Sequence, residues 1–186
     1  MKVLLHACCG PCASYSVEAL RGAGHDVTGY FYNPNIHPSQ EYQRRLASFQ
    51  KLAEAVALPV LSPGDYDFQD WLRQTAYREQ VRCRLCYQGR LEQTARVAKH
   101  GNFDAFTTTL LISPFQQHEV IRQVGEALAV QYDVPFLYLD FRPGFKRSVE
   151  LSKQFDLYRQ QYCGCIYSEA ERYAEKPKKS ARAGRS

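Results

Sequence analysis

Seven cysteines are the residues best suited to chemistry in this chain of 186 amino acids, which contains a single methionine. They form three groups: Cys8, Cys9 and Cys12; Cys83 and Cys86; and Cys163 and Cys165. Because the N-terminus lacks the apolar run of an export signal, we expect a cytoplasmic protein whose thiols stay reduced. Clustered reduced thiols favour metal binding or redox chemistry over structural disulfides.

Three kinds of chemistry fit the first group. Residues 9–12, Cys-Gly-Pro-Cys, have the spacing of a thiol–disulfide oxidoreductase, and a helix beginning there would lower the thiol pKa. The Cys-x-x-Cys segments 9–12 and 83–86 together match the ligand spacing of a zinc site in a zinc-stabilised RNA-binding module. Four thiolates from two loops would instead hold an iron–sulfur cluster, with the remaining thiols available for redox work. The spacing by itself leaves these alternatives open.

Short apolar segments alternate with longer helical stretches around the cysteines. Strands are expected at residues 3–7, 27–32, 59–61, 105–111 and 135–140, and helices at 12–21, 40–57, 68–79, 85–100, 119–132 and 148–159. This alternation predicts an α/β fold with a parallel sheet of about five strands and helices on both faces. Cys8 and Cys9 directly follow the first strand, and the other cysteines lie in connections. Ligands bind beyond the carboxyl ends of such strands, so we expect the thiols to meet there.

Composition and charge divide the chain into two parts. The 45% apolar and 23% charged residues are typical of a globular protein, and no apolar run is long enough to span a membrane. Residues 1–174 are therefore predicted to form a single α/β catalytic domain. Residues 175–186 carry four of the five net positive charges and are predicted to be a disordered tail. The tail would be a solubilising end or an arm for nucleic-acid phosphates.

Six segments together resemble the epoxyqueuosine reductase QueH family. They are residues 6–12 (HACCGPC), 31–38 (FYNPNIHP) with Glu41, Tyr42 and Arg45, 83–87 (CRLCY), 107–114 (TTTLLISP), 140–142 (DFR) and 162–165 (YCGC). The resemblance spans nearly the whole chain, and it implies a fold similar to the nucleotide α-hydrolase (HUP-like) superfamily. It also implies an enzyme that acts on tRNA carrying epoxyqueuosine in the anticodon loop. That enzyme removes the epoxide oxygen to give queuosine, the last step of queuosine biosynthesis.

The resemblance also implies roles for the cysteines. A 4Fe–4S cluster would be held by four thiolates, those of Cys8, Cys9, Cys83 and Cys86. Cys12 would bind a second, mononuclear metal ion, either iron or zinc. Cys163 and Cys165 would form a redox-active pair, whose oxidation to a disulfide releases the two electrons that epoxide reduction needs. Alternatively, these two thiolates would hold an open-site metal that acts as a Lewis acid on the epoxide oxygen. The electron donor is not identified by the sequence.

Several further side chains are candidates for contacts with the substrate. Those expected to bind it are Tyr32, Asn33, His37, Arg84 and Tyr87. Candidates for contacts with RNA phosphates are Arg44, Arg45, Arg82, Arg84 and Arg90, and those for base stacking are Phe31, Tyr32 and Tyr87. Candidate proton donors for the departing oxygen are His6, His37, Tyr32, Tyr87, Asp140 and Tyr162.

Overall fold

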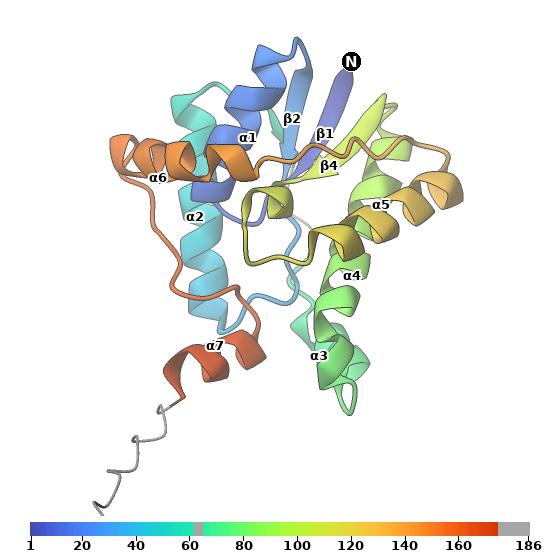
Figure 1. Ribbon diagram of the computed structural model, residues 1–186, viewed down its shortest axis with the longest axis vertical. Coiled ribbons are helices and arrows are strands. Elements are labelled where there is room, and N and C mark those ends of the chain that lie inside the picture. Colours follow the sequence, from blue (N-terminus) through green and yellow to red (C-terminus); the bar gives the residue numbers. More distant parts are fainter. Residues whose placement is uncertain (62–64, 175–186) are drawn as a thin grey trace, which may run out of the picture.

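A parallel sheet forms the centre of the protein (Figure 1). The computed structural model describes residues 1–61 and 65–174, and the predicted basic tail at 175–186 lies outside the described residues. The strands run in the order β3-β2-β1-β4 and comprise β1 (Lys2–His6), β2 (Asp26–Tyr30), β3 (Val60–Leu61) and β4 (Ala105–Thr108). The apolar residues of β1 are buried because a parallel strand inside the sheet is covered on both faces. The predicted α/β architecture is confirmed.

Helices cover both faces of the sheet (Figure 1). One face carries α1 (Gly10–Gly22), α2 (Ser39–Ala55) and α6 (Phe145–Gln154); the other carries α4 (Arg82–His100) and α5 (His118–Tyr132). Beyond the carboxyl ends of the strands, at the bottom of Figure 1, lie α3 (Phe68–Thr75) and α7 (Ile166–Tyr173). Three short 3-10 helices complete the described elements, at Glu79–Val81, Thr109–Ile112 and Arg142–Gly144. Within the described residues, none of the helices combines the length and apolar character needed to cross a membrane.

The sheet is smaller than predicted, with four strands in place of about five. The segment predicted as a strand at 135–140 contributes only one parallel bridge, between Phe106 and Phe136. Two backbone hydrogen bonds support this bridge, from Phe106 N to Pro135 O (2.9 Å) and from Leu137 N to Phe106 O (2.8 Å). Pro135 has no N–H to donate, so the ladder cannot begin earlier, and it does not continue because its partner β4 ends at Thr108. The strand predicted at 105–111 also ends early, because Thr108 Oγ1 accepts the Leu110 N–H and a 3-10 helix begins.

Two helices near the cysteines differ from the prediction. The helix expected to begin at residue 85 begins at Arg82, so Cys83 and Cys86 lie on its first turns and not in a connection. The helix expected at 148–159 covers Phe145–Gln154 instead, and Asp156 follows it with a φ of 48°. A further helix, α7, was not predicted; it begins directly after Cys165.

Gly10 allows α1 to begin close to α2. A Cβ at position 10 would lie 2.5 Å from the backbone oxygen of Ser48, so only glycine fits between Cys9 and Pro11. Pro11 occupies the first turn of α1, where a missing N–H costs nothing. The sequence Cys-Gly-Pro therefore anchors the start of α1 against α2 and holds the first cysteine group at the end of β1.

Candidate metal and redox site

The central strands end together at one edge of the sheet. The register pairs His6 of β1 with Tyr30 of β2 and with Thr108 of β4. The residues that follow meet there: Thr109 Oγ1 accepts the Cys8 N–H at 3.1 Å and donates to Cys8 Sγ at 3.3 Å. Asn33 Nδ2 donates to the carbonyl oxygen of Ala7 at 2.9 Å. The first cysteine group therefore lies at the carboxyl edge, as predicted.

The thiols of Cys8, Cys9 and Cys12 form a compact trio whose sulfur atoms all lie within 4.8 Å of one another. Cys9 is the N-cap of α1, and its sulfur accepts the Cys12 N–H at 3.4 Å. The sulfur atoms of Cys8 and Cys9 lie 3.8 Å apart. Thiolates bound at ~2.3 Å to one tetrahedral ion are about 3.8 Å apart, so this spacing suits a shared metal ion. The trio can bind a metal.

The three thiols of this trio differ in acidity. Hydrogen bonds from Cys12 and Cys9 hold the pKa of the Cys8 thiol well below its ordinary value, and the Arg90 guanidinium and Thr109 hydroxyl lower it further. Burial raises the pKa of Cys9, and hydrogen bonding to Cys8 and Cys9 raises that of Cys12. A bound cation would lower the pKa of all three thiols, because thiolates are the form that binds metals.

The second group, on the first turns of α4, is linked to the strand edge through Asn35. Asn35 Nδ2 donates to Cys86 Sγ at 3.0 Å, and Asn35 Oδ1 accepts from Arg90 Nε at 2.8 Å. Burial raises the pKa of Cys86 to about 12, although the Arg90 guanidinium lowers it. Arg90 also lowers the pKa of Cys8. One buried guanidinium therefore acts on thiols of both groups. Cys83, which is half-buried, lies one turn before Cys86.

The third group borders the other two. Cys163 is exposed and lines a pocket of about 330 Å³ together with Cys8 and Cys12. Gln116 Nε2 donates to Cys163 Sγ at 3.3 Å. Burial raises the pKa of Cys83, and the neighbouring Cys163 and Cys165 add to this rise. The pocket therefore joins Cys163 to the first group, and the link to the second group is the electrostatic effect on Cys83.

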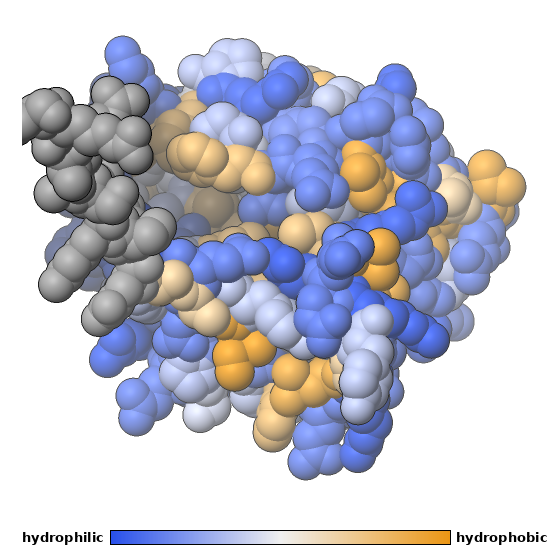
Figure 2. Space-filling model, turned by 60° about the horizontal axis from the view of Figure 1, so that its bottom comes forward, coloured by the Kyte–Doolittle hydropathy of each residue, from blue (hydrophilic) through white to orange (hydrophobic). Residues whose placement is uncertain are grey.

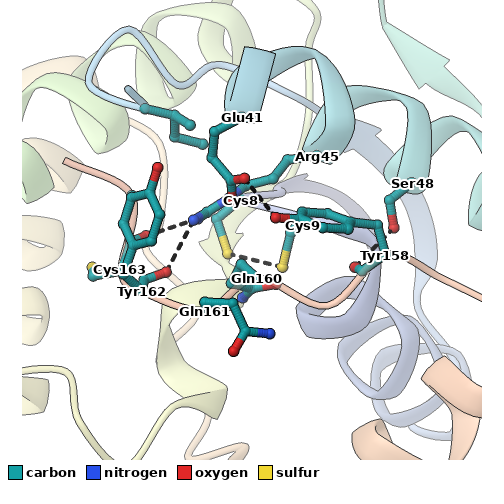
Figure 3. Close-up of polar contacts among 12 residues, drawn as sticks. Cys8, Cys9, Glu41, Arg45, Ser48, Tyr158, Gln160, Gln161, Tyr162 and Cys163 are labelled. Atoms are coloured by element: carbon teal, nitrogen blue, oxygen red, sulfur yellow. Dashed lines mark hydrogen bonds and ion pairs between the residues drawn. The ribbon is translucent and has the colours of Figure 1, made fainter. Parts of the chain in front are cut away.

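A buried ion pair holds the loop that carries Cys163 (Figure 3). Arg45 Nε lies 2.7 Å from Glu41 Oε1, and the Arg45 side chain is 1% exposed. Its other nitrogens donate to the carbonyl oxygens of Cys163 (2.8 Å) and Tyr162 (2.9 Å). Gly164 adopts a φ of 140°, and a Cβ there would lie 3.1 Å from Arg45 Nη1. Arg45 thus fixes the position of the loop by its backbone.

Arg45→Lys should loosen this loop, because a lysine ammonium cannot bind two carbonyls and a carboxylate in the geometry of a guanidinium. We expect the free energy of unfolding to fall by about 1–3 kcal/mol and Cys163 to react faster with an alkylating reagent. Urea unfolding and timed alkylation measure both effects. Arg44→Lys, at the exposed preceding position, is the control and should change stability by less than about 0.5 kcal/mol. Equal alkylation rates in the two variants would contradict the role of Arg45.

His6 is unsuited to the proton-donor role that the sequence suggested. Its Nδ1 lies 2.9 Å from Thr108 Oγ1, and its Nε2 lies 3.0 Å from the carbonyl oxygen of Tyr32. A carbonyl only accepts, so Nε2 carries the proton and Nδ1 accepts from the threonine hydroxyl. Burial lowers the pKa of His6 to about 4. His6 is therefore a neutral structural residue at physiological pH.

His6→Gln should flatten the acid side of the stability profile. The folded His6 stays neutral down to about pH 4, whereas the unfolded histidine takes up a proton near pH 6.5. The wild type should lose up to about 3 kcal/mol more than the variant as the pH falls through this range. Glutamine keeps one donor and one acceptor, and chemical unfolding at several pH values measures the difference. His100→Gln, at the exposed end of α4, is the control. If the stability of His6→Gln fell with pH as steeply as that of the wild type, His6 would not be neutral in the folded state.

The other predicted substrate and proton-transfer residues differ in accessibility. Tyr32 is half-buried and Arg84 is exposed, whereas Asn33, His37 and Tyr87 are buried. Neither ring nitrogen of His37 has a hydrogen-bond partner among the described residues, and its ring packs against Trp71 with centroids 5.3 Å apart. The Tyr87 hydroxyl donates to Gln116 Oε1 at 2.8 Å, which connects it to Cys163.

Several of the earlier expectations are wrong. Arg45 and Arg90 are 1% and 2% exposed, so they cannot contact RNA phosphates from this position. Burial in an α/β core forces both to pair internally, with Glu41 and Asn35. Arg142 holds the pKa of Asp140 at about 2, so this carboxylate is no proton donor at neutral pH. The proton-donor role of Tyr162 stays a prediction; its hydroxyl donates to the carbonyl oxygen of His37.

Five residues that contact the thiols were not singled out as site residues; one of them is Ser168 of α7, whose Oγ lies 3.5 Å from Cys165 Sγ. Asn35 and Thr109 lie inside the quoted motifs, at the ends of strands, and that position was the available signal. Gln116 and Gln160, whose Nε2 lies 3.6 Å from Cys12 Sγ, come from loops far away in the sequence. Nothing in their local sequence indicates these contacts.

Seen from the end where α3 and α7 lie, the surface is mostly hydrophilic with separate hydrophobic patches (Figure 2).

One solved structure is similar in fold. It is a predicted subunit of a tRNA methyltransferase from Methanocaldococcus jannaschii, with a TM-score of 0.53 and 12% sequence identity. The likeness covers 82% of this chain and 75% of that one. At this identity it supports the α/β architecture and nothing about the chemistry.

Sequence comparisons identify the family. The family model described as "Epoxyqueuosine reductase QueH" matches residues 3–171. A relative of that name from Dehalococcoides mccartyi is 40% identical over 174 residues, which cover 94% of this chain and 96% of the relative. Another, from Thermotoga maritima, is 35% identical over 180 residues and covers 91% of each chain. With the motifs spread over three cysteine groups that meet at one edge, the chain belongs to the epoxyqueuosine reductase QueH family.

Proposed function

We propose that this protein reduces the epoxide of epoxyqueuosine in tRNA to the alkene of queuosine. The family match over residues 3–171 carries this proposal, and relatives that bear the reductase name support it. The site is suited to reductive chemistry, because free thiols of the first and third groups, those of Cys8, Cys12 and Cys163, line one open pocket.

Four thiolates, those of Cys8, Cys9, Cys83 and Cys86, hold a 4Fe–4S cluster in this proposal, and Cys12 is free for a second metal ion. The donor set suits such a group, since iron–sulfur clusters take cysteine thiolates: Cys8 and Cys9 lie at the carboxyl edge, and Asn35 from the loop after β2 bonds to Cys86. Support for joining the first and second groups comes from Arg90, which favours the thiolate at both Cys8 and Cys86. When bound, the cluster supplies electron transfer.

Cys163 and Cys165 are the redox-active pair of the proposal. Reduction of an epoxide to an alkene consumes two electrons and two protons and releases the oxygen as water. Oxidation of two thiols to a disulfide releases two electrons and two protons, so the two half-reactions balance. Cys163 is exposed in the pocket, where it can approach a substrate, and Cys165 is buried beside it as the N-cap of α7. An external reductant then restores the dithiol.

The test uses the full chain, purified without oxygen and incubated with an anticodon stem-loop RNA that carries epoxyqueuosine, plus a low-potential reductant. Mass spectrometry of the digested RNA should show the nucleoside with one oxygen fewer. The protein should contain about four iron atoms with acid-labile sulfide. A colourless protein that keeps its activity after chelation would point instead to a thiol–disulfide oxidoreductase. A protein that contains zinc only and leaves the epoxide intact would point to an RNA-binding module.

A further inference from the structure

A second hollow, here named the tyrosine pocket, lies beside the pocket lined by Cys8, Cys12 and Cys163. It has a volume of about 340 Å³, and its wall includes Arg44, Tyr158, Tyr162, Glu169 and Tyr173. Gln161 and Tyr162 line both pockets, so the two hollows share one wall. Figure 3 shows Tyr158, Gln161 and Tyr162 on the segment that leads to Cys163. A ligand that continues past the reacting group would therefore enter the tyrosine pocket next.

The tyrosine pocket presents aromatic faces to solvent. Tyr173 is 63% exposed, and its ring meets that of Tyr162 edge-on with centroids 6.4 Å apart. The Arg44 guanidinium lies 5.9 Å from the centre of the Tyr158 ring. Exposed aromatic rings with an arginine beside them are the means by which proteins stack unpaired nucleobases.

Two charged groups of this pocket are available to a ligand. Arg44 and Glu169 take part in no ion pair within residues 1–61 and 65–174. Glu41, by contrast, is used by Arg45 and by the Tyr158 hydroxyl, which donates to Glu41 Oε2 at 2.6 Å. A free guanidinium suits a phosphate, and a free carboxylate can accept an N–H from the edge of a base.

Tyr173 is the last residue of α7, and five lysines and arginines follow it in the sequence between positions 176 and 185. Such a run of positive charge favours polyanions such as nucleic acids, without base specificity.

We propose that the tyrosine pocket binds an unpaired nucleotide adjacent to the one that is reduced, with its base stacked on Tyr173 and its phosphate near Arg44. The proposal rests on the proposed function, because it takes the substrate to be a single-stranded RNA loop. The shared wall of Gln161 and Tyr162 separates the two nucleotides and sets their order along the loop.

The test is a double-mutant cycle between Tyr173→Ala and RNA stem-loops that lack one base next to the modified nucleotide. Base stacking is worth about 1–3 kcal/mol, so Tyr173→Ala should weaken binding of the intact loop about tenfold. Removing the base on one side should weaken wild-type binding to a similar degree, and the combination should cost no more than either change alone. Tyr77→Ala is the matched control, since Tyr77 is 99% exposed and lines neither pocket.

Arg44→Ala gives a second measurement that does not depend on Tyr173. The slope of the logarithm of the binding constant against the logarithm of the salt concentration should fall by about 1, as expected for one lost phosphate contact. Binding of intact and abasic loops should weaken equally. The proposal would be overturned if Tyr173→Ala and removal of the base each weakened RNA binding independently, or if neither Tyr173→Ala nor Arg44→Ala weakened it. This holds even if the wild type reduces the epoxide. The wild type could instead bind the loop, with Tyr173→Ala and base removal coupled, and yet not reduce the epoxide. The proposed function would then fail, while the proposed nucleotide-binding role of the tyrosine pocket would be supported.

Discussion

Cys163→Ser should abolish epoxide reduction while the protein keeps its metal. Serine cannot form a disulfide, so the two electrons of the dithiol are lost, whereas the Cys8, Cys9 and Cys12 trio is untouched. Cys163 is exposed and contributes its thiol to the pocket, so the change removes little buried surface. Turnover of the modified stem-loop and iron content of the same preparation measure both parts. Iron content is the internal control, because a misfolded variant would lose both.

The outcome also separates the two roles considered for the pair. Loss of activity together with one metal ion would favour an open-site metal held by Cys163 and Cys165, which acts on the epoxide oxygen as a Lewis acid. Loss of activity with full metal content supports the disulfide. A fully active Cys163→Ser would rule out both roles.

Cys83→Ser should abolish the iron–sulfur chromophore. A four-iron cluster needs four thiolates, and a serine hydroxyl in place of the half-buried Cys83 removes one of those proposed. Absorbance in the visible range, iron and sulfide should all fall to background, and activity with them. Arg84→Ser is the matched control for absorbance, iron and sulfide, since Arg84 is exposed and lies on the same turn of α4. Its activity is not used as a control, because Arg84 is itself a predicted substrate contact.

Retention of iron and sulfide in Cys83→Ser would contradict this ligand set. Cys12 would then be the replacement to examine, because its sulfur already lies within 4.8 Å of those of Cys8 and Cys9. In that case Cys12→Ser should lose the chromophore, and the second metal would need other ligands.

The sequence predicted the architecture and the place of the first cysteine group. Apolar runs such as residues 3–5 alternate with helical periodicity, and this pattern depends on neighbouring residues only. Cys8 and Cys9 follow a buried strand directly, so their place at the carboxyl edge follows from the chain direction of a parallel sheet. The motifs in the three cysteine groups indicated the family before any contact was known.

Tertiary structure decided which charged groups face solvent and which side chains touch the thiols. Arg45 and Arg90 have the sequence appearance of surface cations, yet they are buried because partners from other elements, Cys163 and Asn35, surround them. The bridge at Phe136 stops after two hydrogen bonds, and Gln116 reaches Cys163 across 47 positions of the chain. Such contacts depend on how elements pack in space. Local periodicity carries no information on them, because the residues that meet are distant along the backbone.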